Sequence, residues 1–159
     1  MNNRCHKAFT LIEALILVVI MAVLAATIIP QFSTSSREAK LSNLKFNLHL
    51  MRSQLEVYKE NHGGAYPPAA TNADFRNQLT QKTDRNTATN PANGVCGPYI
   101  VGEIPINPFN QNTGVTILRG DTEPAGPTGS ADGWQYNPQH GWFYPNNAEY
   151  FQNSGGFAH

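Results

Sequence analysis

The sequence is poor in charge and in cysteine, and both shortages limit what the chain can be. Only 14% of the 159 residues are charged, and eleven basic side chains balance eleven acidic ones. No basic run occurs, so nucleic acid is not an expected partner. A chain of this length offers one small domain at most once its long apolar segment is set aside.

The cysteines, Cys5 and Cys96, lie on opposite sides of that apolar segment. If the segment spans a membrane, the two thiols cannot meet and no internal disulfide forms. Cys96 is then a lone thiol, for which a partly buried packing role is the expected one rather than a reactive or cross-linking role.

No catalytic or metal-binding pattern is present in the sequence. It has no nucleophile elbow, no phosphate-binding loop, no cysteine–histidine metal pattern and no paired carboxylates at helical spacing in the expected head, residues 65–159. The histidines at positions 49, 62, 140 and 159 show no ligand spacing. We therefore expect no enzyme, and for His62 a capping or surface role.

What the chain does have is a long apolar run from Phe9 to Ile29. As a helix it is about 32 Å long at roughly 1.5 Å per residue, enough to cross a hydrocarbon core of about 30 Å. Arg4 and Lys7 precede it and no acid does. By the positive-inside tendency, the N-terminus is expected to stay cytoplasmic while the rest of the chain is exported.

Glu13 interrupts this run near its start, and it separates the possible readings of the segment. Neither a cleaved secretory signal ending near "VLAAT" nor a plain membrane anchor requires an acid at position 13. An acid at a helix centre costs roughly 2.5–3.5 kcal/mol in a membrane, and less near a helix end. Glu13 therefore favours a third reading, in which the carboxylate has a partner.

A partner arises if the chain is cut between Ala8 and Phe9. The cut frees an α-amino group on Phe9, one helical turn before Glu13. Opposite charges this close in a low-dielectric medium attract strongly, and each relieves the desolvation of the other. The pair could form within one subunit or between Glu13 of one subunit and the amine of its neighbour, where it would set register.

The stretch "KAFTLIEALILVVIMAVLAATIIPQF" resembles the class III signal of type IV pilins and type II secretion pseudopilins. The matching features are the short basic leader, the cut before Phe9, the acid fifth in the mature chain, and Pro30 at the end of the apolar stretch. The resemblance implies that a membrane-embedded prepilin peptidase cleaves after Ala8 and methylates Phe9. The family favours Gly before the cut, so Ala8 is a departure; we expect processing to be kept, and its rate is open.

A second helical segment follows Pro30. Proline should kink or loosen a helix that continues, or else mark the end of the span. Ser35 and Glu38 could form a capping box for a fresh start or lie mid-helix. Beyond them, apolar residues at spacings of three and four predict an amphipathic helix that packs against the chain's own sheet, with a coiled-coil partner as the alternative. These residues are Leu41, Leu44, Leu48, Met51, Leu55 and Tyr58.

The end of this helix and the first part of the head have clear signals. "NHGGAYP" stops the helix with Gly63 and Gly64 and continues as an extended segment, and the resemblance implies the same ending. "NADFRNQLTQKT" predicts a short helix with Asn72 as its cap and Phe75 and Leu79 facing inward.

Four strands are predicted after that helix: one in "GPYIVGEIPINPF", one in "GVTILRG", and two in the hairpin "GWQYNPQHGWFYP". In the hairpin we expect four aromatics on one face, which pack against the helix or, alternatively, stack on a sugar. They are Trp134, Tyr136, Trp142 and Tyr144. The resemblance also raises calcium, for which Asp121, Glu123 and Asp132 are candidates, but they are too scattered for more than a solvated loop to be expected.

The predicted fold class is α+β, a pilin-like fold whose long N-terminal helix packs on a small antiparallel sheet. Residues 1–8 are the expected leader, 9–30 the transmembrane half of the helix, 31–64 its amphipathic half, and 65–159 the globular head. The expected location is a bacterial inner membrane crossed once, in contact with lipid, with the head in the periplasm.

The predicted function is that of a structural subunit of a type II secretion pseudopilus, with no cofactor. The resemblance implies a fibre of this chain and other pseudopilins, processed by the prepilin peptidase and assembled by an inner-membrane platform protein and an ATPase. Assembly is assigned to Phe9, Glu13 and Pro30. The alternatives are a type IV pilus pilin, major or minor, and a secreted or anchored carbohydrate-binding module.

Overall fold

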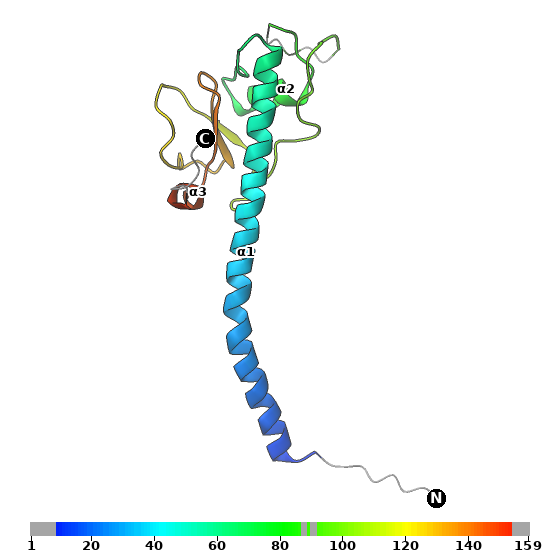
Figure 1. The fold of residues 1–159 in the computed structure, drawn as a ribbon, viewed down its shortest axis with the longest axis vertical. Helices are drawn as coiled ribbons and strands as arrows, with labels where there is room; N and C mark the ends of the chain where they lie inside the picture. Colours follow the sequence, from blue (N-terminus) through cyan, green and yellow to red (C-terminus); the bar gives the residue numbers. More distant parts are fainter. Residues whose placement is uncertain (1–8, 87–88, 90–91, 154–159) are drawn as a thin grey trace, which may run out of the picture. The chain divides into compact units, whose positions relative to one another are not determined.

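The structure is a computed structural model that describes residues 9–86, 89 and 92–153, and of residues 27–34 and 153 the backbone only. Three helices and three strands occur in the described ranges (Figure 1). The helices are α1 (Leu11–Asn61), α2 (Asn72–Thr80) and α3 (Ala148–Asn153). The strands are β1 (Val115–Ile117), β2 (Trp134–Asn137) and β3 (Trp142–Pro145).

The chain divides into two compact units, residues 1–39 and 40–159. In the first, helix begins at Leu11, and every described side chain is exposed. The expected leader, residues 1–8, and the side chains of residues 27–30 lie outside what is described. Over the described residues, no helix has both the length and the apolar character needed to cross a membrane.

Helix α1 continues through Pro30, so the helix does not end there, and Ser35 and Glu38 lie mid-helix. It ends at Asn61, as the glycine pair predicts. Gly63 and Gly64 have φ values of +65° and +91°, which side chains with a Cβ rarely adopt. The N–H of Gly64 donates to the carbonyl of Lys59 over 2.9 Å, which satisfies one of the last carbonyls of the helix.

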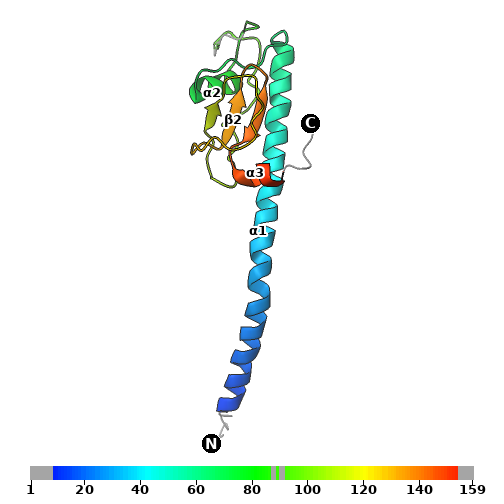
Figure 2. The ribbon, with the colours of Figure 1, turned by 90° about the vertical axis from the view of Figure 1, so that its left-hand side faces the viewer.

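The second unit is built on the apolar stripe of α1. Leu44, Leu48, Met51, Leu55 and Tyr58 are all buried, which confirms that this face packs within the chain. Figures 1 and 2 show α2 and the sheet beside the part of α1 that follows Lys40. Burial of each such side chain stabilises the fold by about 1.5–3 kcal/mol, so the stripe fixes how the head sits on the helix.

Helix α2 confirms the predicted short helix, but its cap lies one residue earlier than the expected Asn72. Thr71 caps the helix, because its Oγ1 accepts from the N–H of Asp74, and the Asp74 carboxylate accepts from the N–H of Thr71. The Thr71 hydroxyl also donates to the Asp74 carboxylate over 2.9 Å, and this bond, together with the one from the Thr71 N–H, lowers the pKa of Asp74. Asn72 instead accepts from the N–H of Val115 and ties α2 to the sheet. Phe75 and Leu79 are buried as expected.

The described fold is α+β, as predicted, but its sheet is mixed rather than antiparallel, which corrects that part of the prediction. Its order is β1-β2-β3; β2 and β3 form the predicted antiparallel hairpin, but β1 runs parallel to β2. A parallel pair needs a long return connection, and residues 118–133 supply one. The expected first strand, residues 97–109, contains no strand; its prolines remove backbone donors, and it follows a looping path.

The hairpin register overturns the prediction that its four aromatics share a face. Tyr136 lies opposite Phe143, and Gln135 lies opposite Tyr144. Opposed residues share a face, so Trp134 and Tyr136 join Phe143 on one side, while Trp142 and Tyr144 point to the other. A shared face for all four aromatics would require a turn one residue longer than the observed one, in which Asn137 pairs with Trp142. The shift of one residue moves every side chain of β3 to the opposite face of the sheet.

The face with Phe143 forms the aromatic core of the head. Phe143 stacks on Trp134 with ring centroids 5.2 Å apart, and Phe75 of α2 packs 4.4 Å from Tyr136. The Tyr136 hydroxyl donates to the carbonyl of Pro67 over 2.9 Å. Burial raises the pKa of Tyr136, as expected for a phenol held away from water.

The packing of Tyr66 against Gly141, in the turn between β2 and β3, can be tested by substitution. Its φ is +72°, and a Cβ added there would overlap the ring of Tyr66. Gly129 has a similar φ of +79° but open space around it. We expect Gly129→Ala to cost about 1 kcal/mol of unfolding free energy from the backbone alone. Gly141→Ala should cost a further ~1–3 kcal/mol from overpacking.

The measurement is denaturant unfolding of the full chain in detergent, with Gly129→Ala as the matched control. Equal losses for the two variants would mean that Tyr66 does not close on the turn.

Candidate functional site

The candidate assembly site at the N-terminus consists of Phe9 and Glu13. Phe9 precedes α1, and Glu13 lies in its first turn, where the N–H of Glu13 donates to the carbonyl of Thr10 over 3.1 Å. Both side chains are exposed. In the described part of the chain the Glu13 carboxylate has no hydrogen bond or ion pair, so it is available for a partner outside this fold.

A continuous apolar surface surrounds Glu13. The large apolar side chains from Phe9 to Leu24 are between 44% and 86% exposed, Leu17 the least and Leu11 the most. Soluble monomers rarely expose contiguous apolar surface on this scale, which usually marks a surface for protein or lipid. The arrangement therefore combines one available carboxylate with an apolar helix that has no core of its own.

Pro30, the third predicted assembly residue, lies within α1. Ala8, on the leader side of the expected cut, lies outside the described residues, and so do the side chain of Pro30 and the residues Cys5 and His159. Their assigned roles stay predictions.

His62 is a buried structural residue at the end of α1. Its Nδ1 donates to the carbonyl of Tyr58 over 2.8 Å, so its Nε2 accepts from the hydroxyl of Thr83 at 2.9 Å. The ring also stacks on Tyr58 with centroids 3.8 Å apart. The expected capping role is therefore correct, and His62 in addition ties the helix end to the loop after α2.

Cys96 lies in this loop and is free and half-buried. Its backbone pairs with that of Thr83 through bonds of 2.9 and 3.0 Å, and its thiol lies 3.9 Å from the carbonyl of Asn61. This placement suits the packing role predicted for a lone thiol.

The three candidate calcium ligands do not converge in the structure. Asp121 pairs with the Nε2 of His140 at 3.1 Å, and Glu123 accepts a hydrogen bond from the Tyr144 hydroxyl. Asp132 accepts from the hydroxyl of Thr116 at 2.7 Å. Within the described ranges no group of three or more His, Cys, Asp or Glu side chains is placed to hold a metal ion. The acids do not fit a calcium site, and the absence of a cofactor stays a prediction.

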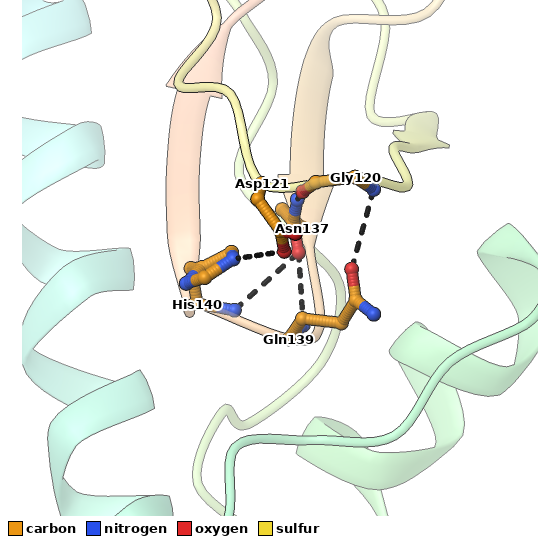
Figure 3. A network of polar contacts seen from close by, with 5 residues as sticks. All are labelled: Gly120, Asp121, Asn137, Gln139 and His140. Atoms are coloured by element: carbon orange, nitrogen blue, oxygen red, sulfur yellow. Dashed lines mark hydrogen bonds and ion pairs between the residues drawn. The ribbon is translucent and has the colours of Figure 1, made fainter.

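Asp121 instead takes part in a polar network that holds the hairpin turn, drawn in Figure 3. Asn137 is its centre: its Nδ2 donates to the carbonyl of Gly120 over 2.8 Å, and its Oδ1 accepts from the N–H groups of Gln139 and His140. The side chain of Gln139 closes the ring by accepting from the N–H of Gly120. The network fixes the turn against the loop after β1.

Sequence reasoning missed a cavity of about 590 Å³ beside this turn. Its walls come from α1 and from the β2–β3 hairpin, and its residues include Arg52, Glu56, Tyr66, His140 and Trp142. Only the position of Arg52 beside the apolar stripe signals it in the sequence. The cavity depends on contacts between residues about ninety positions apart, which no local pattern reveals.

Comparison with known proteins supports the resemblance stated for the N-terminus. Residues 3–29 match the family described as the prokaryotic N-terminal methylation motif. The chain is also similar to the type II secretion system core protein G of Pseudomonas aeruginosa, with 36% identity over 67 residues. That alignment covers 42% of this chain and 46% of the relative, so the chain spans about half the length of the curated relative it matches. No solved structure was found to match.

These findings confirm the predicted recognition of a pilin-like, pseudopilin-related chain over its N-terminal motif and the aligned part.

The position of the three acids predicts how the head responds to calcium. Because Asp121, Glu123 and Asp132 each have a separate partner, we expect millimolar calcium to raise the Tm of the full chain by less than about 1 °C. The check is thermal unfolding with calcium and with a chelator, using magnesium as the matched control. A calcium-specific rise of several degrees would show that the loop rearranges around the ion.

Proposed function

We propose that this chain, which carries a prokaryotic N-terminal methylation motif and is similar to a type II secretion core protein, is a structural subunit of a pseudopilus. The observation that carries the proposal is the unpaired Glu13 carboxylate in an exposed apolar helix, within the matched motif. Processed subunits stack helix to helix in a periplasmic fibre that drives protein export.

The apolar helix supports this proposal because the described fold leaves its apolar side chains exposed, and another apolar environment has to bury them. In the inner membrane, lipid surrounds residues 9–30 as a transmembrane segment, with the N-terminus cytoplasmic and the head periplasmic. In the fibre, neighbouring helices replace the lipid. The exchange of one apolar environment for another keeps the helix out of water throughout, so a subunit can leave the bilayer without exposing its apolar surface.

The Glu13 carboxylate gives this packing its register. After cleavage between Ala8 and Phe9, the methylated α-amino group of Phe9 remains a cation, and a carboxylate in low dielectric is strongly stabilised by it. Apolar helices can slide along one another at little cost, whereas a displaced ion pair leaves two buried charges unpaired. Pairing with the neighbouring subunit therefore selects one stagger among many.

The partners follow from this assembly. A prepilin peptidase cuts and methylates the chain, other pseudopilins join it in the fibre, and a platform protein with its ATPase supplies the work of extraction. Pro30 is assigned to local loosening of α1 in the fibre, since it removes one backbone hydrogen bond from the helix.

Among the alternatives, a type IV pilus pilin shares every N-terminal feature. Deletion of the gene separates the two proposals, because loss of visible surface fibres indicates a pilus and loss of protein export without such fibres a pseudopilus. The carbohydrate-binding alternative requires a face of four exposed aromatic rings. Two of the four, Trp134 and Tyr136, are fully buried and unable to stack on a sugar.

Processing gives the first prediction of the proposed function. We expect the mature protein to begin at Phe9 and to carry one added methyl group, because the matched motif spans the cut. Intact-mass analysis of the protein purified from membranes measures this. Ala8→Leu should block the cut by replacing a small side chain with a bulky one, and Ala8→Gly is the matched control that retains it. A mature end near Thr27 would instead indicate an ordinary secreted protein.

The second prediction concerns Glu13→Ala. Removal of the carboxylate also removes a cost of insertion, so we expect normal membrane insertion but at least about tenfold fewer subunits in fibres, the loss of about 1.4 kcal/mol of pairing. The assay separates sheared fibres from membranes and quantifies the chain in each. Glu38→Ala, which removes an exposed acid of α1 outside the apolar run, is the control. Normal fibre yield from Glu13→Ala would exclude the ion pair as the source of register.

A further inference from the structure

The cavity between α1 and the hairpin is suited to binding a carboxylate. Arg52 reaches it from the helix, and aromatic side chains from Tyr66 and Trp142 line its walls. Two histidines, His49 and His140, also border it. The lining therefore combines the Arg52 cation and aromatic surface with one acid, Glu56, which suits a ligand with a carboxylate beside an apolar group as long as Glu56 is paired elsewhere.

Arg52 is held in position but not satisfied. Its Nε donates to the carbonyl of Phe143 over 3.2 Å, and its guanidinium lies 4.7 Å from the centroid of the Tyr144 ring. A guanidinium has five N–H donors, and within the described residues the other four have no partner. An arginine oriented in this way loses little further freedom when it binds a carboxylate.

The acids of the cavity region are engaged elsewhere. Glu56 accepts from the Tyr66 hydroxyl over 2.8 Å and lies 3.6 Å from the Nζ of Lys59. Asp121 pairs with His140. Neither carboxylate bonds to Arg52, so within the described residues the guanidinium is available to a carboxylate of another molecule.

The segment Val101–Ile106 carries a matching group. Val101 is 94% exposed and Ile106 is 51% exposed, and Glu103 lies exposed between them. In the described part of the chain, the Glu103 carboxylate has no hydrogen bond or ion pair. The segment is nevertheless anchored, because Pro105 accepts from the indole N–H of Trp134 over 2.7 Å. It presents a carboxylate between two apolar side chains on a fixed base.

The segment and the cavity lie on different flanks of α1. The carbonyl of Ile106 accepts from Asn47, whereas the carbonyl of Phe143, beside the cavity, accepts from Arg52. Five residues at roughly 100° each place Asn47 and Arg52 about 140° apart around the helix. Complementary surfaces on different flanks make a heterologous contact, which repeats from copy to copy and generates an open filament.

We propose that Val101–Ile106 of one copy docks in the Arg52 cavity of the next, with Glu103 bound to the guanidinium. The contact rests on the proposed fibre function, and it adds a second, head-to-head register beside the one at Glu13. Val101 and Ile106 cover the aromatic walls, so water is displaced around the ion pair and the pairing is stronger than at an open surface.

Crosslinking of the full chain tests the docking. Val101→Cys and Ser53→Cys place one thiol on the segment and one at the cavity, and Cys96→Ser removes the described native thiol. We expect the chain with both new cysteines to give a ladder of crosslinked oligomers under mild oxidation, because each copy has both surfaces. Chains with either new cysteine alone are the controls and should not form a ladder.

Charge exchange then tests the ion pair. Glu103→Arg, at an exposed position that leaves folding intact, should reduce the ladder at least about tenfold, corresponding to ~1.4 kcal/mol. Glu60→Arg, at another exposed acid of the same unit, is the matched control. Adding Arg52→Glu to Glu103→Arg should restore the ladder, which a merely structural role of Arg52 would not do.

The crosslinked ladder is measured both in membranes that contain the assembly machinery and with purified chain in detergent. A fibre that forms normally without the ladder overturns the docking and leaves the proposed function intact. A ladder that Glu103→Arg does not change also overturns it. Absence of fibres and of N-terminal processing counts against the proposed function, while the detergent sample still scores the docking.

Discussion

The head depends on one packing contact, the apolar stripe of α1 against the aromatic side chains of α2 and the hairpin. Met51, Leu55 and Tyr58 have almost no exposed surface, and Phe75 and Phe143 complete the same core. The sheet has only three short strands, and a sheet this small is not stable alone. The helix therefore acts as the second layer of the domain as well as the continuation of the apolar segment.

This double use of α1 links the fold to the proposed function. The described side chains up to residue 39 are all exposed, whereas residues from Lys40 onward supply the helix face of a core. One helix, α1 (Leu11–Asn61), therefore contributes residues to both units.

Polar contacts decide details that burial leaves open. His62 and Thr83 lock the helix end, Thr71 starts α2, and Asn137 holds the turn against the loop after β1. Each satisfies backbone groups that would otherwise be buried without partners. Arg52 is the contrasting case: its Nε donates to Phe143, and among the described residues its other donors have no partner, which is why a binding role is proposed for it.

The sequence by itself determined the features that follow from local spacing: the apolar run with Glu13, the stripe on α1, the glycine stop, α2, β1 and the hairpin. Only the tertiary structure decided the rest. A one-residue change in the register of β3 moved Trp142 and Tyr144 to the other face, and β1 paired parallel because the 118–133 connection allows it to return. The Arg52 cavity was equally hidden, because it joins residues distant in the chain. Local patterns report which face of an element is apolar, whereas strand partners and cavities depend on energies summed over the whole fold.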